Sequence, residues 1–171
     1  MRMPTPAQPR RNTEGNGPLA YFLTFTTYGT WLHGDARGSV DTAHREFETP
    51  RAARNADRER AMRHHMTGES VVMDRELRNA VTAAIRTACE YKGWVLEAVN
   101  VRTNHVHVVV GAPIEPERVL TTLKAWATRR CRERGLLAPE ARFWTRHGST
   151  RYLWTERDIE KAATYVVEGQ D

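Results

Sequence analysis

Two histidines separated by one residue, His105 and His107, are the side chains of this sequence best suited to bind a metal ion. Residues 105–110 have the composition of a β-strand, and because strand side chains alternate, both imidazoles project from the same face. A separation of about 6.6 Å lets both rings reach one ion at about 2.1 Å. With seven histidines in the chain, chance predicts about 0.3 such pairs, so two solvated histidines on an open sheet face are the alternative.

A tyrosine near the C-terminus, Tyr165, is the candidate nucleophile. It lies about 130° from the centre of the apolar stripe of a predicted helix. An incidental surface aromatic, the commoner case, would lie there too, so this is the alternative interpretation. A phenol is mostly protonated at neutral pH and attacks phosphate poorly without help, which a divalent ion at the histidine pair would supply. Tyr152 is the next candidate. The stripe consists of Ile159, Ala162, Ala163, Val166 and Val167.

Basic residues are concentrated in the segment 118–151. It carries nine cations and two acids, a local net charge of +7 against +5 for the whole chain, and aromatic residues lie between the cations. This pattern is typical of a nucleic-acid-binding surface. Arginine also binds phosphate in a bidentate way, although GC-rich coding produces the same arginine bias. The expected DNA contacts are Lys124, Arg129, Arg130, Arg142, Trp144, Arg146 and Arg151.

Strands are predicted at 21–27, 94–100 and 105–110, with one or two short strands within 142–154. Helices are predicted from an N-cap at Asp74 to Gly93, from Pro116 onward, and from a capping box at Thr155 and Asp158 onward. This order predicts an α+β fold, a ferredoxin-like βαββαβ antiparallel sheet with an additional C-terminal helix. Helices would cover one sheet face and leave the other to ligands or to a second subunit.

The length of 171 residues indicates a single domain, expected at 19–171 with a polar insertion at about 33–73. Residues 1–18 are polar and contain four prolines, so they are expected to form a disordered leader and not a secretory signal. No apolar run is long enough to span a membrane, and we expect a cytoplasmic protein. Cys89 and Cys131 occupy apolar helical positions, as reduced core thiols do.

The segment Asn104-His105-Val106-His107-Val108-Val109-Val110, on such a sheet and followed by one tyrosine on a C-terminal helix, resembles the HUH single-tyrosine transposases. The most similar members are the insertion-sequence-200 type and their relatives associated with repetitive extragenic palindromes. The resemblance covers roughly 21–31 and 74–170, and Trp144-Thr145-Arg146 resembles the aromatic-x-Arg stretch before the last strand in those relatives.

The resemblance implies that His105 and His107 bind Mg²⁺ or Mn²⁺ and that Tyr165 attacks single-stranded DNA, leaving a 5′-phosphotyrosine. It also implies a homodimer that acts on DNA hairpins. The family's third ligand usually follows the tyrosine by four residues, where this chain has Gly169. The candidates are therefore Glu168, which a continuous helix places about 60° from Tyr165, and Gln170, which a helix break at Gly169 would bring closer. Of the two, Glu168 is favoured.

A domesticated protein that binds single-stranded nucleic acid without cutting it is the alternative function. A reader of the RRM type has the same sheet topology but places stacking aromatics on its central strands. The strand that carries His105 and His107 has no aromatic residue, which disfavours that version.

Overall fold

The computed structural model of the protein describes residues 17–30, 57 and 69–168. The leader at 1–18, except for its last two residues, and most of the predicted insertion at 33–73 lie outside these residues. The described elements are β1 (Ala20–Thr26), α2 (Arg75–Lys92), β2 (Val95–Val101), β3 (His105–Gly111), α3 (Pro116–Glu133), β4 (Ser149–Leu153) and α4 (Glu156–Glu168).

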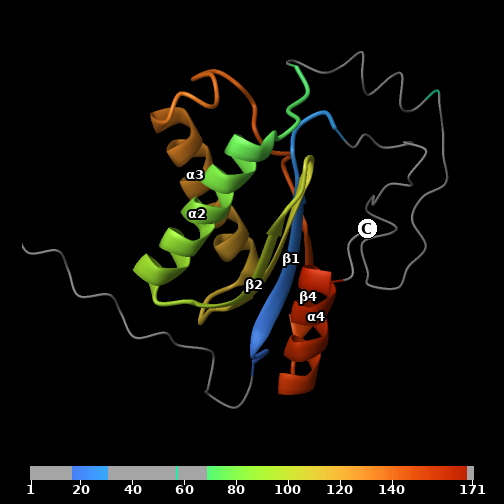
Figure 1. Ribbon diagram of the computed structural model, residues 1–171. Helices are drawn as coiled ribbons and strands as arrows, with labels where there is room; N and C mark the ends of the chain where they lie inside the picture. The colour runs from blue at the N-terminus through green and yellow to red at the C-terminus, as the bar shows by residue number, and fades with distance from the viewer. Residues whose placement is uncertain (1–16, 31–56, 58–68, 169–171) are drawn as a thin grey trace, which may run out of the picture.

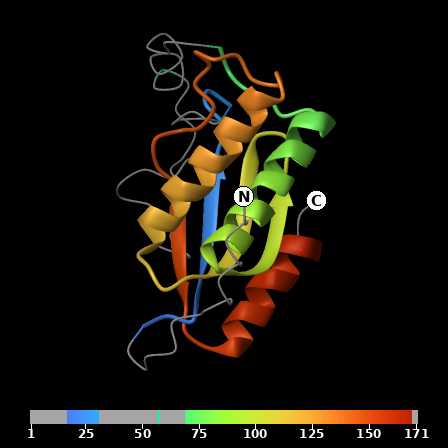
Figure 2. The same cartoon turned by 90° about the vertical axis from the view of Figure 1, so that its left-hand side faces the viewer.

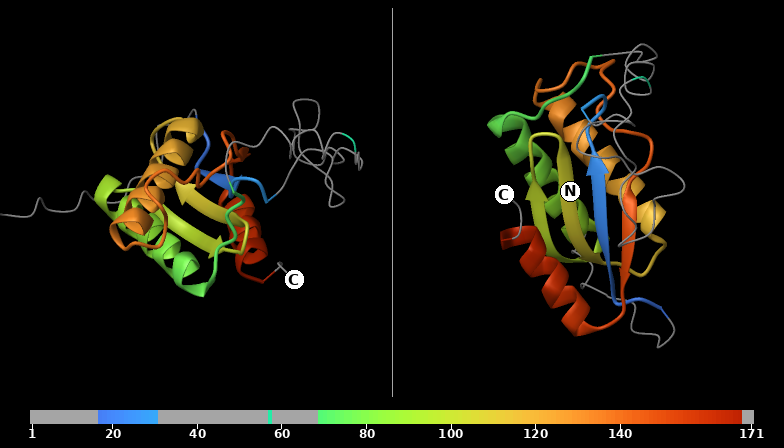
Figure 3. Two further views of the ribbon diagram at one scale, coloured as in Figure 1. Left: turned by 90° about the horizontal axis from the view of Figure 1, so that it is seen from above. Right: turned by 90° about the vertical axis from the view of Figure 1, so that its right-hand side faces the viewer.

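The four strands form one sheet in the order β2-β3-β1-β4, and every neighbouring pair is antiparallel. Helix α2 connects β1 to β2 and helix α3 connects β3 to β4, so the predicted ferredoxin-like βαββαβ arrangement is confirmed. Both helices cover the same face of the sheet (Figure 1 and Figure 2). Helix α4 lies across the other face, as the view from the right-hand side shows (Figure 3).

The helix ends follow from local side-chain chemistry. The Asp74 carboxylate accepts a hydrogen bond from the backbone N–H of Leu77 at 2.8 Å, which caps α2. Gly93 ends that helix in the left-handed region, with φ of 65°. At the start of α4, Thr155 and Asp158 exchange reciprocal hydrogen bonds of 3.0 and 3.1 Å, and the bond from Thr155 lowers the pKa of the Asp158 carboxyl.

Strand β3 carries apolar side chains on both faces of the sheet. Val106, Val108 and Val110 are buried in the main core beneath α2 and α3. Val109 projects from the opposite face into a smaller apolar cluster beneath α4. Helix α4 therefore covers part of the face that the sequence left to ligands. The cluster also contains Ala20, Ala98, Leu153, Ile159, Ala162 and Val166.

One residue of the helical stripe differs from the prediction. Val167 is 67% exposed, although its spacing from Ile159 predicts burial. It lies beside the edge strand β2, where it lines an open hollow together with Leu96 and Val99. Strand β2 is the edge of the described sheet, so none of the described strands covers this side chain. None of the described helices is long and apolar enough to cross a membrane.

Candidate active site

A row of polar residues crosses the sheet on the face that α4 partly covers. The strand register pairs His107 with Thr24 of β1 and with Asn100 of β2. Directly opposed residues project from the same face, so the three side chains lie next to one another. The adjacent row, one pleat further along, is apolar and contains Phe22 and Val109. The face is thus apolar under the first turns of α4 and polar near its last turn.

The two histidines predicted to bind a metal lie together in this polar region. Their ring centroids are 4.7 Å apart and the rings are nearly perpendicular, at 75°. Nδ1 of His107 hydrogen-bonds Oγ1 of Thr24 at 2.7 Å, and Nδ1 of His105 hydrogen-bonds Oδ1 of Asn104, also at 2.7 Å. His107 is only 8% exposed. Both rings therefore use the same nitrogen, Nδ1, for hydrogen bonds to a neighbouring strand or turn.

The tyrosine predicted as nucleophile lies beside the histidine pair. The Tyr165 ring is 6.3 Å from the His107 ring and 5.9 Å from the Phe22 ring, centroid to centroid. Its side chain is 49% exposed. Asn100 fixes this end of α4 by donating a hydrogen bond from Nδ2 to the Val166 carbonyl at 2.8 Å. Histidines and tyrosine come together within a single copy of the chain.

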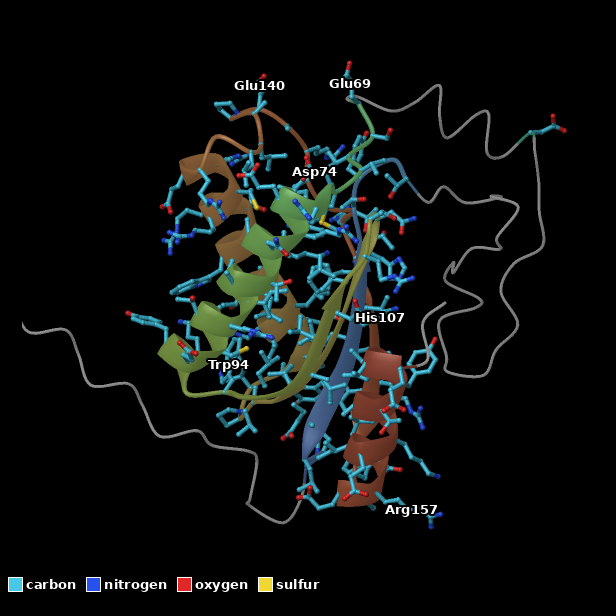
Figure 4. All side chains as sticks on the ribbon, in the orientation of Figure 1. Glu69, Asp74, Trp94, His107, Glu140 and Arg157 are labelled. Atoms are coloured by element: carbon cyan, nitrogen blue, oxygen red, sulfur yellow. The ribbon has the colours of Figure 1, made fainter. Side chains whose placement is uncertain are left out.

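Figure 4 shows the same relation along the helix. His107 lies at the level of the C-terminal end of α4, whereas Arg157 marks its N-terminal end. The C-terminal end of a helix carries a partial negative charge, which favours a cation nearby. The carbonyl groups of the last turn of α4 therefore make the electrostatic environment of the histidine pair favourable for a metal ion.

The donor chemistry of the pair fits a divalent metal ion, which two imidazoles from one strand would bind through Nε2. Among the described residues, however, no group of three His, Cys, Asp or Glu side chains is arranged to hold a metal. Glu168 is the last described residue of α4 and is exposed, but it does not complete such a group. Gln170 lies outside the described residues. The structure thus brings together two of the predicted ligands.

Among the predicted DNA-binding residues, Arg151 is on the same side of the sheet as Tyr165. It pairs with Phe22 across β1 and β4, so its side chain projects from the face that carries the candidate site. Arg146 is exposed in the segment before β4, and the Arg142 guanidinium lies 5.0 Å from the centre of the Tyr28 ring. The cations at 142–151 are thus on β4 or on the segment that leads into it.

Lys124, predicted to bind DNA, has inward contacts. Its Nζ donates hydrogen bonds to the carbonyls of Thr145 and His147, at 2.9 and 3.1 Å, and so fixes the segment before β4. Burial lowers the pKa of the Lys124 ammonium to about 8. These contacts assign Lys124 a structural role.

Trp144, also predicted to bind DNA, is half-buried and packs against the main core. Its Nε1 donates to the Lys124 carbonyl at 3.2 Å and to Oγ1 of Thr128 at 3.1 Å. Its ring stacks on Phe143, with centroids 4.0 Å apart, and meets the edge of Phe25. These contacts hold the half-buried indole against the core, so much of its surface is already in use.

Arg129 and Arg130 belong to α3, on the sheet face opposite Tyr165. The Arg129 guanidinium lies 5.0 Å from the centre of the Trp126 ring and its Nε is 3.8 Å from Glu133. Surface contacts of this kind are worth little in stability. The basic segment 118–151 is therefore divided between two sides of the molecule.

Three residues around the site were not singled out by the sequence, Phe22, Thr24 and Asn100, and Asn104 was named only as the first residue of the segment that carries the histidines. Asn104 directly precedes His105, and this adjacency was the available signal. Phe22, Thr24 and Asn100 join the site through strand register, which the local pattern of a single strand does not specify.

Comparisons with known proteins give the family and the fold. The family described as "Transposase IS200 like" matches residues 66–165. A putative transposase from Deinococcus radiodurans R1 is similar in structure over 92% of this chain and 95% of that chain, with a TM-score of 0.50 and 15% identity. A REP-associated tyrosine transposase, solved bound to a REP hairpin, matches over 97% of this chain and 69% of that chain, with a TM-score of 0.46 and 12% identity.

No curated protein matches this sequence. The structural similarities, at such low identities, concern the fold. The family match covers more than half of the chain, includes the strand with His105 and His107, and ends at Tyr165. The chain therefore belongs to the IS200-like transposase family.

Proposed function

We propose that this protein cleaves and rejoins single-stranded DNA through Tyr165, with a divalent metal ion held by His105 and His107. The observation that supports the proposal is the 6.3 Å distance between the Tyr165 and His107 rings within one chain. A half-exposed tyrosine beside two imidazoles is accessible to a phosphodiester and close to the candidate ligands. Membership of a transposase family supports DNA as the substrate.

In the proposed reaction the Tyr165 hydroxyl attacks the phosphorus of a phosphodiester. The new bond joins the tyrosine oxygen to phosphorus, and the bond from phosphorus to the 3′ oxygen breaks. The phenolic proton leaves to solvent and the departing 3′ oxygen takes up a proton, so the products are a 5′-phosphotyrosine and a free 3′-hydroxyl. Attack by a 3′-hydroxyl on the phosphotyrosine reverses these steps and rejoins the strand. His105 and His107 would hold a Mg²⁺ or Mn²⁺ ion, which would supply positive charge to stabilise the negative charge of the reacting phosphate.

The remaining features of the proposal concern substrate and assembly. Arg151 projects from the same face as the site and is the candidate phosphate contact nearest to it by register. The resemblance to the HUH enzymes supports a hairpin-containing substrate and a homodimer. Because histidines and tyrosine meet in one copy, each protomer of such a dimer would carry its own complete set of these three residues.

Glu168 and Gln170 are the candidate third ligands, and single alanine variants decide between them. A carboxylate binds Mg²⁺ or Mn²⁺ more strongly than an amide, so we expect Glu168→Ala to lose more cleavage activity at limiting Mn²⁺. Loss of activity only in Gln170→Ala would show that the helix breaks at Gly169. Full activity in both variants would show that water or DNA completes the coordination.

The test of the proposed function is a covalent adduct. The protein is incubated with labelled single-stranded hairpin DNA and Mn²⁺, and adducts are separated on a denaturing gel. We expect an adduct with the unmodified protein, none with Tyr165→Phe, and DNA binding within a few-fold in both, because the substitution removes only one hydroxyl. Tyr152→Phe is the matched control, since Tyr152 is about equally exposed and projects from the other face. An adduct that persists in Tyr165→Phe would assign the nucleophile to another residue.

A second candidate function is binding of single-stranded DNA without cleavage. The absence of a three-residue metal group among the described side chains supports this reading. Tight, salt-dependent DNA binding without a covalent adduct, whichever divalent metal ion is added, would establish binding without cleavage as the function.

A further inference from the structure

We propose that Thr24 and Asn104 are positioning residues that hold His107 and His105 in the tautomer able to bind a metal ion through Nε2. The inference rests on the proposed function, because it assigns the histidines to a metal. It adds two residues from other parts of the fold, a central strand and a hairpin turn, to the machinery of the site. Four steps support it.

The first step concerns Asn104. Its Oδ1 lies 2.7 Å from Nδ1 of His105. An amide oxygen only accepts hydrogen bonds, so Nδ1 of His105 must carry the proton. In a neutral imidazole the lone pair then resides on Nε2, the atom that would face a metal ion.

The second step concerns Thr24. Its Oγ1 lies 2.7 Å from Nδ1 of His107, directly across the β1–β3 pair. A hydroxyl accepts as well as donates, and acceptance by Thr24 leaves the lone pair of His107 on Nε2. His107 is 8% exposed, so water has little access to replace the threonine if its hydroxyl is removed.

The third step is that both supports are themselves fixed. The backbone carbonyl of Asn104 accepts hydrogen bonds from the N–H of Thr27 at 2.8 Å and from its Oγ1 at 3.2 Å, which ties the hairpin turn to the end of β1. Thr24 is in the middle of β1, between β3 and β4. The backbone of neither residue can move away from its histidine without disturbing the sheet.

The fourth step is geometric. The centroids of the two rings are 4.7 Å apart and the rings are nearly perpendicular. They can bind one ion together only if each ring keeps its orientation. An imidazole attached to the backbone only through its Cβ is free to rotate, whereas a hydrogen bond to Nδ1 fixes both the orientation of the ring and its tautomer. Each histidine has its own such partner, so the pair is arranged before a metal arrives.

The test uses the metal-free protein labelled with ¹⁵N-histidine, studied by NMR in alkaline buffer, where imidazole is neutral. We expect both rings to carry the proton on Nδ1. Thr24→Val has nearly the same shape but no hydroxyl, and it should produce a mixture of tautomers for His107 alone. Asn104→Ala should do the same for His105. Each variant should bind Mn²⁺ about 10- to 100-fold more weakly.

Two further variants separate this role from a general structural effect. Thr24→Ser retains the hydroxyl and should recover both the tautomer and the Mn²⁺ affinity. Thr121→Val makes the same substitution at an exposed threonine of α3, whose hydroxyl donates to the Glu117 carbonyl at 2.8 Å, so both histidines should be unaffected. A proton on Nε2 of His107 in the unmodified protein would overturn the proposal. So would equal Mn²⁺ affinity in Thr24→Val and Thr121→Val.

The outcomes also separate this inference from the proposed function. If no covalent adduct forms but the tautomers and Mn²⁺ affinity change as expected, the positioning role stands and cleavage fails. If the adduct forms and Thr24→Val binds Mn²⁺ normally, cleavage stands and the positioning role fails. The tautomer measured in the unmodified protein needs no variant, so it decides the proposal even if Thr24→Val does not fold.

Discussion

His105 and His107 share one strand face but differ in their surroundings. His107 is buried between Thr24 and Asn100 in the central part of the sheet, whereas His105 lies closer to the hairpin turn and is partly exposed. The two side chains are therefore expected to tolerate substitution differently. Loss of His107 removes a packed ring, but loss of His105 removes little buried volume.

For metal binding, however, His105→Ala and His107→Ala should have the same effect. Each leaves a single imidazole, and a metal ion held by fewer protein ligands binds more weakly. We expect weaker Mn²⁺ binding by calorimetry and suppressed cleavage in both variants. His147→Ala, at an exposed histidine before β4, is the control that should leave both unchanged. Unchanged Mn²⁺ affinity in both site variants would refute the metal site.

The buried ammonium of Lys124 predicts a pH dependence of stability. Burial lowers its pKa from 10.5 to about 8 in the folded protein, so between pH 8 and 10.5 the unfolded chain binds more protons than the folded one. The free energy of unfolding should therefore gain a contribution that rises with pH across this window. Denaturant unfolding at pH 7.5 and pH 10 should show the unmodified protein gaining stability relative to Lys124→Met. A constant difference between the two proteins would contradict this assignment.

At the scale of elements, the position of α4 depends on a contact from β2. Asn100 donates to the Val166 carbonyl, one residue beyond Tyr165, and so connects the tyrosine helix to the strand beside His107. Asn100→Ala should lower the free energy of unfolding by about 1 kcal/mol, the typical net value of one hydrogen bond.

Asn100→Ala should also affect the candidate site, although it removes neither Tyr165 nor either histidine. We expect faster hydrogen exchange in the last turn of α4 and a lower cleavage rate, because Tyr165 is held less firmly over the sheet. Asn79→Ala, at an exposed asparagine of α2, is the matched control. Unchanged exchange in α4 would show that the apolar contacts of Ile159, Ala162 and Val166 alone position the helix.

The elements themselves were largely predictable because their signals are local. Asp74 and Gly93 end α2 through a side-chain cap and a left-handed backbone, and both are visible in the sequence. The alternation of histidine and valine in β3 likewise predicted which side chains face the main core.

The contacts between elements were not predictable in the same way. Thr24 meets His107 only because β1 pairs with β3 in one particular register, and a shift of one residue would turn Thr24 to the other face. The inward roles of Lys124 and Trp144 depend on how the segment before β4 folds back on α3. Charge and aromatic content alone indicated a DNA surface at both positions.

At the scale of the whole molecule, the fold divides the basic segment 118–151. Helix α3, with Arg129, packs on one face of the sheet, whereas Arg151 of β4 projects from the other, where Tyr165 lies. A single strand of DNA that reaches Tyr165 is therefore close to only part of the +7 charge. The location of each arginine, more than the net charge, should decide its contribution to binding.

Salt dependence measures this division. If about four phosphates are neutralised along the strand, the logarithm of the binding constant should fall with the logarithm of salt concentration at a slope near −3. We expect Arg151→Ala to reduce the magnitude of that slope by about 0.7, one phosphate contact, and Arg129→Ala to leave it unchanged. Fluorescence anisotropy with a hairpin oligonucleotide checks both. An equal reduction in the two variants would mean that DNA also contacts the α3 side, and a slope near zero would mean that the arginine bias does not serve DNA binding.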